Sequence, residues 1–191
     1  MKFKVRIITK AARYGIKVYV ITDAVTAYVL KVIFYTGRST YHAESETIEK
    51  KKTVMVVEKL VEPFVGTHRT IYVDRFYTSL DLLKSLAERN LYITGTLVQN
   101  RIPKEIRVVK TSAEYKGMQR GDSLKCKISF TKADGTTKSE AGLVCWKDRK
   151  IVYCLSNDSN NHEVDECRRR GNGGILQVER PISIANYNRY M

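Results

Sequence analysis

Two runs of β-branched and aromatic residues dominate the first part of the chain. They span Tyr14–Asp23 and Tyr28–Tyr35, with the turn-forming residues 23–26 where the first run ends. Such runs are typical of β-strands, and a short connection joins antiparallel neighbours. The pattern therefore predicts a hairpin over residues 14–35. Because both runs are apolar almost throughout, we expect helices to cover both faces of the sheet.

A helical period follows this hairpin. Apolar residues recur at three- and four-residue spacing over residues 54–64, and Pro63 stands where that helix should end. Residues 70–74 are a predicted short strand that ends in a carboxylate, residues 79–89 a second amphipathic helix, and residues 92–96 another strand. This order predicts an α/β domain with a mixed sheet.

The pattern changes after Thr96, where periodicity weakens as far as Gly121. Strand-like runs then cover residues 123–130, 142–150 and 151–156, with Asp134-Gly135 and Asp148-Arg149 as hairpin turns between them. We expect these strands to form a separate β-rich unit.

The last third of the chain is more polar. Residues 157–174 are rich in turn-forming and basic residues, which predicts a mobile basic loop. Residues 181–191 are expected to start a helix at Ser183, with no following element to bury it.

The composition of the chain indicates which kind of partner it prefers. The 191 residues suit one domain, and 43% hydrophobic with 28% charged residues suit a packed core. Lys and Arg number 34 against 20 Asp and Glu, a net charge of +14. This balance favours a polyanionic partner, nucleic acid first, over a merely soluble basic surface.

Membrane insertion and secretion are disfavoured. No apolar run approaches the about 20 residues that span a bilayer, and the basic start leads into no signal-like segment. The four cysteines, Cys126, Cys145, Cys154 and Cys167, form no Cys-x-x-Cys pair, so we expect reduced and mostly buried thiols in a cytosolic or nuclear protein. A metal site using His162 and Cys167 lacks a second ligand pair and is disfavoured.

Two carboxylates carry the candidate chemistry. Asp23 and Asp74 each stand at the carboxyl end of a predicted strand, and adjacent strands would bring them together. Paired carboxylates suit Mg²⁺ or Mn²⁺, and two such ions activate water and stabilise a leaving 3′-oxygen in phosphodiester cleavage. The alternative is that Asp acts only as a turn former at a strand end, Asp23 especially.

Several short motifs lie along essentially the whole chain: residues 13–17, Asp23 with Thr26 and Tyr28, residues 35–37, residues 73–79, residues 95–96 with 100–101, residues 146–148 with 152–156, and residues 187–191. Taken together and in this order, they resemble the catalytic domain of piggyBac-type transposases. Arg75 departs from the pattern, because Asn often follows the second aspartate in the family. No metal ligand is lost by this departure.

The resemblance implies an α/β, RNase H-like (retroviral-integrase-like) fold, a mixed sheet with helices interrupted by a β-rich insertion. Residues 1–97 are then the N-terminal part of the catalytic domain, residues 98–180 the insertion domain, and residues 181–191 the start of the helix that leads to the family's third aspartate.

The resemblance also implies a function. In the family, three aspartates bind divalent metal and carry out strand nicking, hairpin formation and transfer into TTAA sites. Asp23 resembles the first and Asp74 the second, and both are therefore the expected catalytic and metal-binding residues. The third lies in a Gly-Gly-Val-Asp segment expected after Met191, so residues 1–191 alone are expected to be inactive. The implied partners are transposon-end and target DNA, and the implied cofactor is Mg²⁺ or Mn²⁺. The resemblance also implies a nuclear location and a homodimer in a full-length form.

Basic side chains supply candidate phosphate contacts, which weaken steeply with salt. The candidates are Arg38, Lys50, Lys51, Lys52, Arg75, Arg101, Arg168, Arg169 and Arg170, with Lys104, Lys147 and Arg149 beside them. Tyr77 or Trp146 is a candidate for stacking on an unpaired base, although an aromatic residue beside a strand more often belongs to the core.

Two alternatives to catalysis stay open at this point. In the first alternative, the chain is a domesticated DNA-binding protein without catalysis. In the second, it is a non-functional remnant of a transposable element.

Overall fold

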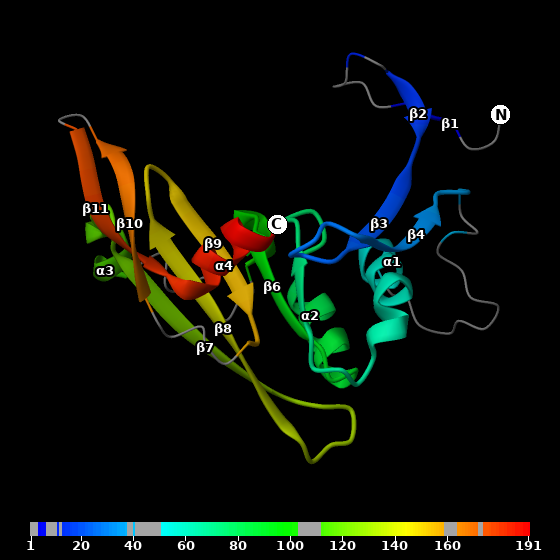
Figure 1. The fold of residues 1–191 in the computed structure, drawn as a ribbon. Coiled ribbons are helices and arrows are strands. Elements are labelled where there is room, and N and C mark those ends of the chain that lie inside the picture. The colour runs from blue at the N-terminus through cyan, green and yellow to red at the C-terminus, as the bar shows by residue number, and fades with distance from the viewer. Residues whose placement is uncertain are drawn as a thin grey trace. The chain divides into compact units, whose positions relative to one another are not determined.

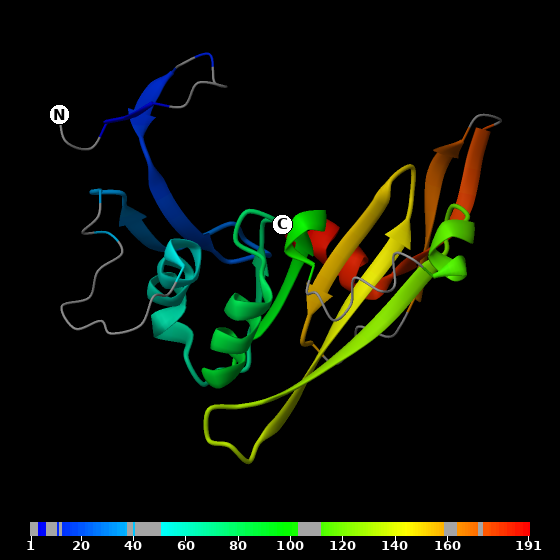
Figure 2. The ribbon, with the colours of Figure 1, turned by 180° about the vertical axis from the view of Figure 1, so that it is seen from behind.

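The computed structural model describes residues 4–6, 11, 13–37, 40, 51–102, 112–158, 164–171 and 174–191, with the backbone alone for residues 169–171 and 176. By their contacts, the residues divide into two compact units, Met1–Val65 and Gly66–Met191. Figures 1 and 2 show the elements of each unit from opposite sides.

In the residues that the structure describes, the first unit holds two antiparallel hairpins, one α-helix and a short 3-10 helix. β1 pairs with β2 and β3 with β4, and α1 packs against β3 and β4. The bounds are Lys4–Arg6 for β1, Tyr14–Ile16 for β2, Val18–Thr22 for β3, Val29–Phe34 for β4, Lys52–Val61 for α1 and Glu62–Phe64 for the 3-10 helix η2. The predicted hairpin and the helix that follows it are confirmed.

Alternate residues of the β3–β4 hairpin differ sharply in exposure. Tyr19, on the face of α1, is 4% exposed, whereas Val20 is 46% and Phe34 61% exposed on the other face. The expectation that both faces are covered is therefore wrong for the residues that the structure describes. One helix covers one face of a two-stranded sheet, and an apolar run alone does not reveal how many helices are present.

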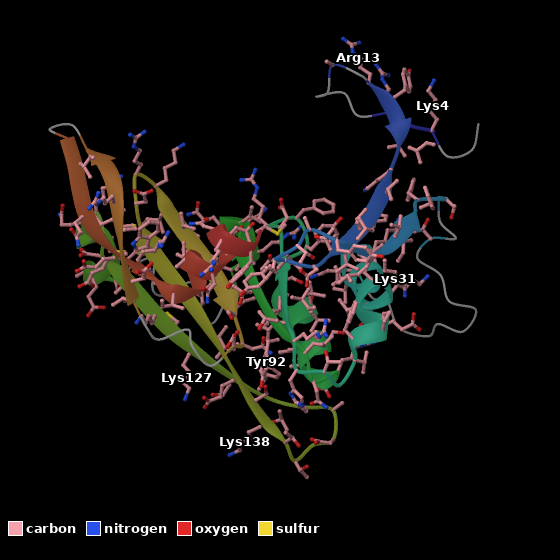
Figure 3. The ribbon with its side chains drawn as sticks, in the orientation of Figure 1. Lys4, Arg13, Lys31, Tyr92, Lys127 and Lys138 are labelled. Carbon is pink, nitrogen blue, oxygen red and sulfur yellow. The ribbon has the colours of Figure 1, made fainter. Side chains whose placement is uncertain are left out.

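Lys31 ties β4 to the carboxyl end of α1. Its ammonium group donates to the carbonyl of Lys59 at 2.5 Å and to the carboxylate of Glu62 at 3.0 Å. A cation at the last turn of a helix satisfies carbonyls that have no partner within the helix, and it interacts favourably with the helix dipole. Figure 3 labels Lys31 beside the helix.

A five-stranded mixed sheet forms the centre of the second unit. Its strand order is β5-β6-β9-β8-β7, with β5 and β6 parallel and the other pairs antiparallel. The strands are Thr70–Val73 (β5), Tyr92–Leu97 (β6), Ser123–Thr131 (β7), Lys138–Lys147 (β8) and Ile151–Ser156 (β9); the helices before the last hairpin are Leu80–Glu88 (α2), Gln99–Arg101 (the 3-10 helix η3) and Ala113–Gly117 (α3). The prediction of an α/β chain with a mixed sheet is confirmed, but the residue 14–35 hairpin pairs apart from this sheet as β3–β4.

Helix α2 lies between β5 and β6 in the chain, as the pattern predicted, and the structure shows that these two strands are parallel. The Ser79 hydroxyl caps its first turn by accepting from the N–H of Leu82 at 3.2 Å. Asn90, with a φ of 52°, adopts the left-handed conformation that ends helices and returns the chain to β6. The buried side chains are Leu82, Leu83, Leu86 and Ala87, as their helical spacing predicted.

The predicted turns at Asp134 and Asp148 are present. Asp134 accepts hydrogen bonds from the Thr137 hydroxyl and from the N–H groups of Thr136 and Thr137. These bonds lower the pKa of the Asp134 carboxyl to about 2, and the bond from the Thr137 hydroxyl has the largest effect. Asp148 forms an ion pair with Arg120 at 2.8 Å. Figure 2 shows the long β7–β8 hairpin that the first turn closes.

The strands after residue 97 continue the sheet that begins with β5. β9 pairs with β6, with Thr94 opposite Ser156, and the two hydroxyl oxygens lie 2.7 Å apart. The expectation that these strands form a separate β-rich unit is therefore wrong, because they share one sheet and one compact unit with β5 and β6. The boundaries of an inserted domain at 98–180 remain a prediction, because continuity of a sheet does not decide which segment entered an ancestral fold.

The expectation of a loop over residues 157–174 is wrong for the described part of that segment. β10 (Val164–Gly171) pairs with β11 (Gly174–Pro181) in an antiparallel hairpin. Arginine and glutamate side chains on the exposed face masked the alternation. Asn172-Gly173 stands between the strands, and this dipeptide is a strong hairpin signal.

The β10–β11 hairpin is anchored through one buried aromatic residue. Trp146, 2% exposed, packs with Val178 and Ile184, and Cys167 contacts this cluster. The Trp146 indole N–H donates to the Glu179 carbonyl at 2.8 Å. Trp146 therefore belongs to the core, and its interpretation as a base-stacking residue is wrong.

The last helix, α4 (Ile182–Tyr190), packs back onto earlier elements. It contacts β6, β9, β10 and β11, and Ile184 is 2% exposed. The expectation that nothing would bury this helix is wrong, because it needs no following element. Within the described ranges, no helix is long and apolar enough to cross a membrane.

The four cysteines are free thiols, as expected. Cys145 and Cys154 are buried, and Cys126 and Cys167 are half-buried. Burial raises the pKa of the Cys154 thiol to about 12. His162, the other half of the disfavoured metal site, lies outside the described residues.

Val178→Ala should loosen the anchor of the β10–β11 hairpin. We expect a loss of about 1–3 kcal/mol in the free energy of unfolding, because truncation leaves a cavity beside Trp146. The emission of Trp146, the single tryptophan of the chain, should shift to longer wavelength. Ile175→Ala, at a site that is 74% exposed on the same hairpin, is the control and should change both by little. Equal effects of the two variants would contradict this packing.

Thiol reactivity should follow burial. At pH 8, below the raised pKa of Cys154, its reactive thiolate is scarce. We expect Cys126 and Cys167 to react with a chromogenic disulfide before Cys145 and Cys154, which should react only on unfolding. A single fast phase of four thiols in the native protein would contradict the assignment.

Candidate functional site

Asp74 stands directly after β5, at the carboxyl end of the strand. Its side chain is exposed, and Oδ1 accepts the N–H of Phe76 at 2.8 Å. The Asp74 carbonyl accepts the N–H groups of Tyr77 at 2.9 Å and Thr78 at 3.1 Å. These bonds fold residues 74–78 into a tight turn. The turn holds the Asp74 carboxylate in one orientation, at the position that the sequence predicted.

Thr78 and Gly95 form the base of this turn. The Thr78 side chain is fully buried, and its hydroxyl donates to the Asp74 carbonyl at 3.0 Å. Gly95 pairs with Val73 on the neighbouring strand. A Cβ on Gly95 would lie 2.4 Å from Thr78 Oγ1 and 2.7 Å from the Val73 carbonyl oxygen. The turn after β5 can therefore approach β6 this closely only because residue 95 has no side chain.

Arg101 contacts the outer side of the same turn. Its Nη1 donates to the Phe76 carbonyl at 2.6 Å, with longer contacts to the carbonyls of Arg75 at 3.3 Å and Thr78 at 3.4 Å. Sequence analysis named Arg101 only as a phosphate contact, which stays a prediction. Nothing in the sequence links residues 25 positions apart, so this contact needed the structure.

Asp23 occupies a similar place at the end of β3. Its Oδ1 accepts the N–H groups of Val25 at 3.1 Å and Thr26 at 2.8 Å, and the Thr26 hydroxyl at 2.8 Å. Ala27, with a φ of 58°, completes the turn. Asp23 is thus a turn former, as the alternative interpretation expected. The same bonds also fix the direction of its carboxylate.

The two carboxylates belong to different units, Asp23 to the first and Asp74 to the second. The strands that they follow, β3 and β5, belong to different sheets of the described residues, so the expectation that adjacent strands bring the carboxylates together is wrong. Their convergence on one metal site stays a prediction. The donor chemistry fits, because oriented carboxylate oxygens are the ligands that Mg²⁺ and Mn²⁺ prefer. Among the described residues, no three His, Cys, Asp or Glu side chains gather into a complete metal site.

The candidate DNA contacts lie on several elements. Lys51 and Lys52 are exposed at the start of α1, Arg75 is exposed in the turn after Asp74, and Arg168 is exposed on β10. Arg169 and Arg170 follow on β10 with only their backbone described, and Arg38, Lys50 and Lys104 lie outside the described residues. Figure 3 shows further lysines, Lys127 and Lys138, that extend from the β7–β8 hairpin.

Two aromatic residues follow the candidate carboxylate in the turn. The rings of Phe76 and Tyr77 meet edge to face with centroids 5.1 Å apart. Phe76 is 52% exposed, whereas Tyr77 is half-buried. Sequence analysis singled out Tyr77 as a stacking candidate and missed Phe76, because only the turn geometry decides which of the two neighbours faces solvent.

Similarity to known proteins extends over essentially the whole chain. The family model described as Transposase IS4 matches residues 1–191. A cryo-EM structure of the piggyBac transposase synaptic complex with hairpin DNA is similar, with a TM-score of 0.69 and 27% sequence identity. The match covers 99% of this chain and 34% of that chain, so the chain spans about a third of the length of its structural relative.

Gly95→Ala should destabilise the turn that carries Asp74. We expect a loss of about 1–3 kcal/mol in the free energy of unfolding, since the new methyl group must displace Thr78 or the Val73 backbone. Urea unfolding of the full chain measures it. Gly117→Ala, at a position with nothing within 4 Å, is the control and should be neutral or stabilising. Equal stability of the two variants would contradict the close approach.

Proposed function

This chain belongs to the Transposase IS4 family and is of the piggyBac type, and we propose that Asp23 and Asp74 hold divalent metal ions in its catalytic site. The observation that carries the proposal is the presentation of Asp74. Its carboxylate is exposed at the end of β5, the edge strand of the five-stranded sheet, and accepts the N–H of Phe76. Since a carboxylate offers about four acceptor sites, one such bond leaves capacity for a cation.

The chain's own residues have two tasks in this proposal. The turns after β3 and β5 orient the two carboxylates, and the exposed lysines and arginines hold the phosphate backbone of the DNA. When bound, Mg²⁺ or Mn²⁺ supplies water activation and charge neutralisation for phosphodiester cleavage and strand transfer. DNA as partner is supported by the solved relative, which is a synaptic complex with hairpin DNA.

Finer features of the proposal rest on the family resemblance. They include an RNase H-like arrangement with residues 98–180 as an insertion, TTAA target sites, a nuclear location and a homodimer. The third aspartate is expected outside residues 1–191. A polypeptide of these residues should therefore bind metal weakly and nick DNA little, because two carboxylates neutralise less of the cationic charge and position it less well.

A second candidate function is DNA binding without catalysis. The net charge of +14 favours it, because phosphate contacts are sequence-independent and need only positive side chains at the surface. In this alternative Asp23 and Asp74 are turn formers alone. A remnant without activity would show neither metal binding at these residues nor salt-dependent DNA binding.

Metal binding tests the first candidate. Mn²⁺ affinity of the full chain, measured by electron paramagnetic resonance, should fall about tenfold or more in Asp23→Asn and in Asp74→Asn, because each loses a charged ligand while it keeps an oxygen for the turn. Asp81→Asn, another exposed carboxylate seven residues after Asp74, is the matched control and should keep its affinity. Unchanged affinity in Asp74→Asn would overturn the metal site.

DNA binding tests the second candidate. The affinity of the chain for a duplex should fall linearly with salt on logarithmic axes, and each lost phosphate contact should reduce the slope by about 0.9. Lys52→Ala and Arg168→Ala should each do so. Lys127→Ala, which removes a lysine paired with Glu140 on the β7–β8 hairpin, should leave the slope unchanged. Fluorescence anisotropy of a labelled duplex measures it, and Asp74→Asn should bind as tightly as the wild type in the absence of metal. A slope of zero would contradict DNA binding.

A further inference from the structure

Both backbone groups of Phe76 are engaged, one on each side of the turn. Its N–H donates to Asp74 Oδ1 at 2.8 Å, and its carbonyl accepts from Arg101 Nη1 at 2.6 Å. A single residue thus links the guanidinium of Arg101 to the carboxylate of Asp74. The link is short, because it consists of two hydrogen bonds and one residue's backbone.

The donor side of this link is itself well anchored. Arg101 ends the 3-10 helix η3, and its N–H donates to the Val98 carbonyl at 2.9 Å. The next residue, Ile102, is 3% exposed. The Arg101 backbone is therefore fixed on both sides. Its planar guanidinium needs little further ordering to reach three carbonyls of the turn.

We propose that Arg101 is a positioning residue for Asp74: by holding the Phe76 carbonyl, it orients the Phe76 N–H and with it the carboxylate that binds metal. This inference rests on the proposed metal site. It assigns Arg101 a role through another residue, distinct from a direct contact with a DNA phosphate. Groups that orient a metal ligand in this way typically change metal affinity about 10–100-fold when they are removed.

Because Arg101 is positively charged, the direction in which metal affinity changes when Arg101 is neutralised tests the inference. Removal of a cation near a metal site strengthens cation binding by electrostatics alone. Loss of a positioning contact weakens it. A decrease in metal affinity on neutralising Arg101 therefore reports positioning and cannot come from the charge itself.

The closing experiment measures Mn²⁺ affinity, hydrogen exchange of the Phe76 amide and salt-dependent DNA affinity in the full chain. Arg101→Gln should lower Mn²⁺ affinity about tenfold and speed exchange of that amide. Arg101→Lys, which keeps one donor and the charge, should recover most of the affinity. Arg75→Gln, the matched control, removes a charge from the same turn without removing the donor to Phe76, and it should leave affinity equal or higher.

The outcomes separate this inference from the proposed metal site. If Asp74→Asn abolishes Mn²⁺ binding but Arg101→Gln leaves affinity and amide exchange unchanged, the positioning role is wrong and the metal site stands. A loss of only salt-dependent DNA affinity in Arg101→Gln would overturn positioning in favour of a phosphate contact. If the wild type and Asp74→Asn bind Mn²⁺ alike, both proposals fail.

Discussion

The close approach of the β5 turn to β6 at Gly95 is the constraint on which the candidate site depends. The absence of a side chain at residue 95 lets Thr78 bury its hydroxyl group beneath the turn and donate to the Asp74 carbonyl. Parallel pairing of β5 with β6 sets the level at which this happens, with Val73 opposite Gly95. The position of Asp74 is therefore decided by sheet register and by packing beneath the turn, before any interaction of its own carboxylate.

The conformation of the turn is further restricted by hydrogen bonds on its outer side. Phe76 donates to Asp74 and accepts from Arg101, so three residues share one hydrogen-bonded path. Asp23 is oriented by more local bonds, since its Oδ1 accepts from Val25 and Thr26, within the next three residues. The two turns thus present carboxylates in the same way. The Asp74 turn also receives a hydrogen bond from a residue distant in sequence, which makes it sensitive to change elsewhere.

Local patterns predicted most of the elements and both carboxylate positions. The leucines of α2 and the runs that became β3, β4 and β7–β9 are short-range signals that depend on spacing alone. The β10–β11 hairpin was missed because charged residues fill its exposed face, while its inward contacts, Val178 and Cys167 against Trp146, come from distant strands. The same reason hid the bond from Arg101 to Phe76 and the burial of α4. Contacts between segments far apart in sequence leave no period to detect.

The central claim is that Asp23 and Asp74 bind one metal centre, and paramagnetic broadening by Mn²⁺ tests it most directly. In a heteronuclear NMR titration of the full chain, amide signals of residues 23–26 and 74–78 should broaden together at the same Mn²⁺ concentration. Both sets should recover in Asp74→Asn, because one ligand serves the same ions as the other. Broadening at residues 23–26 that persists in Asp74→Asn, or that begins at a different Mn²⁺ concentration, would contradict a shared centre.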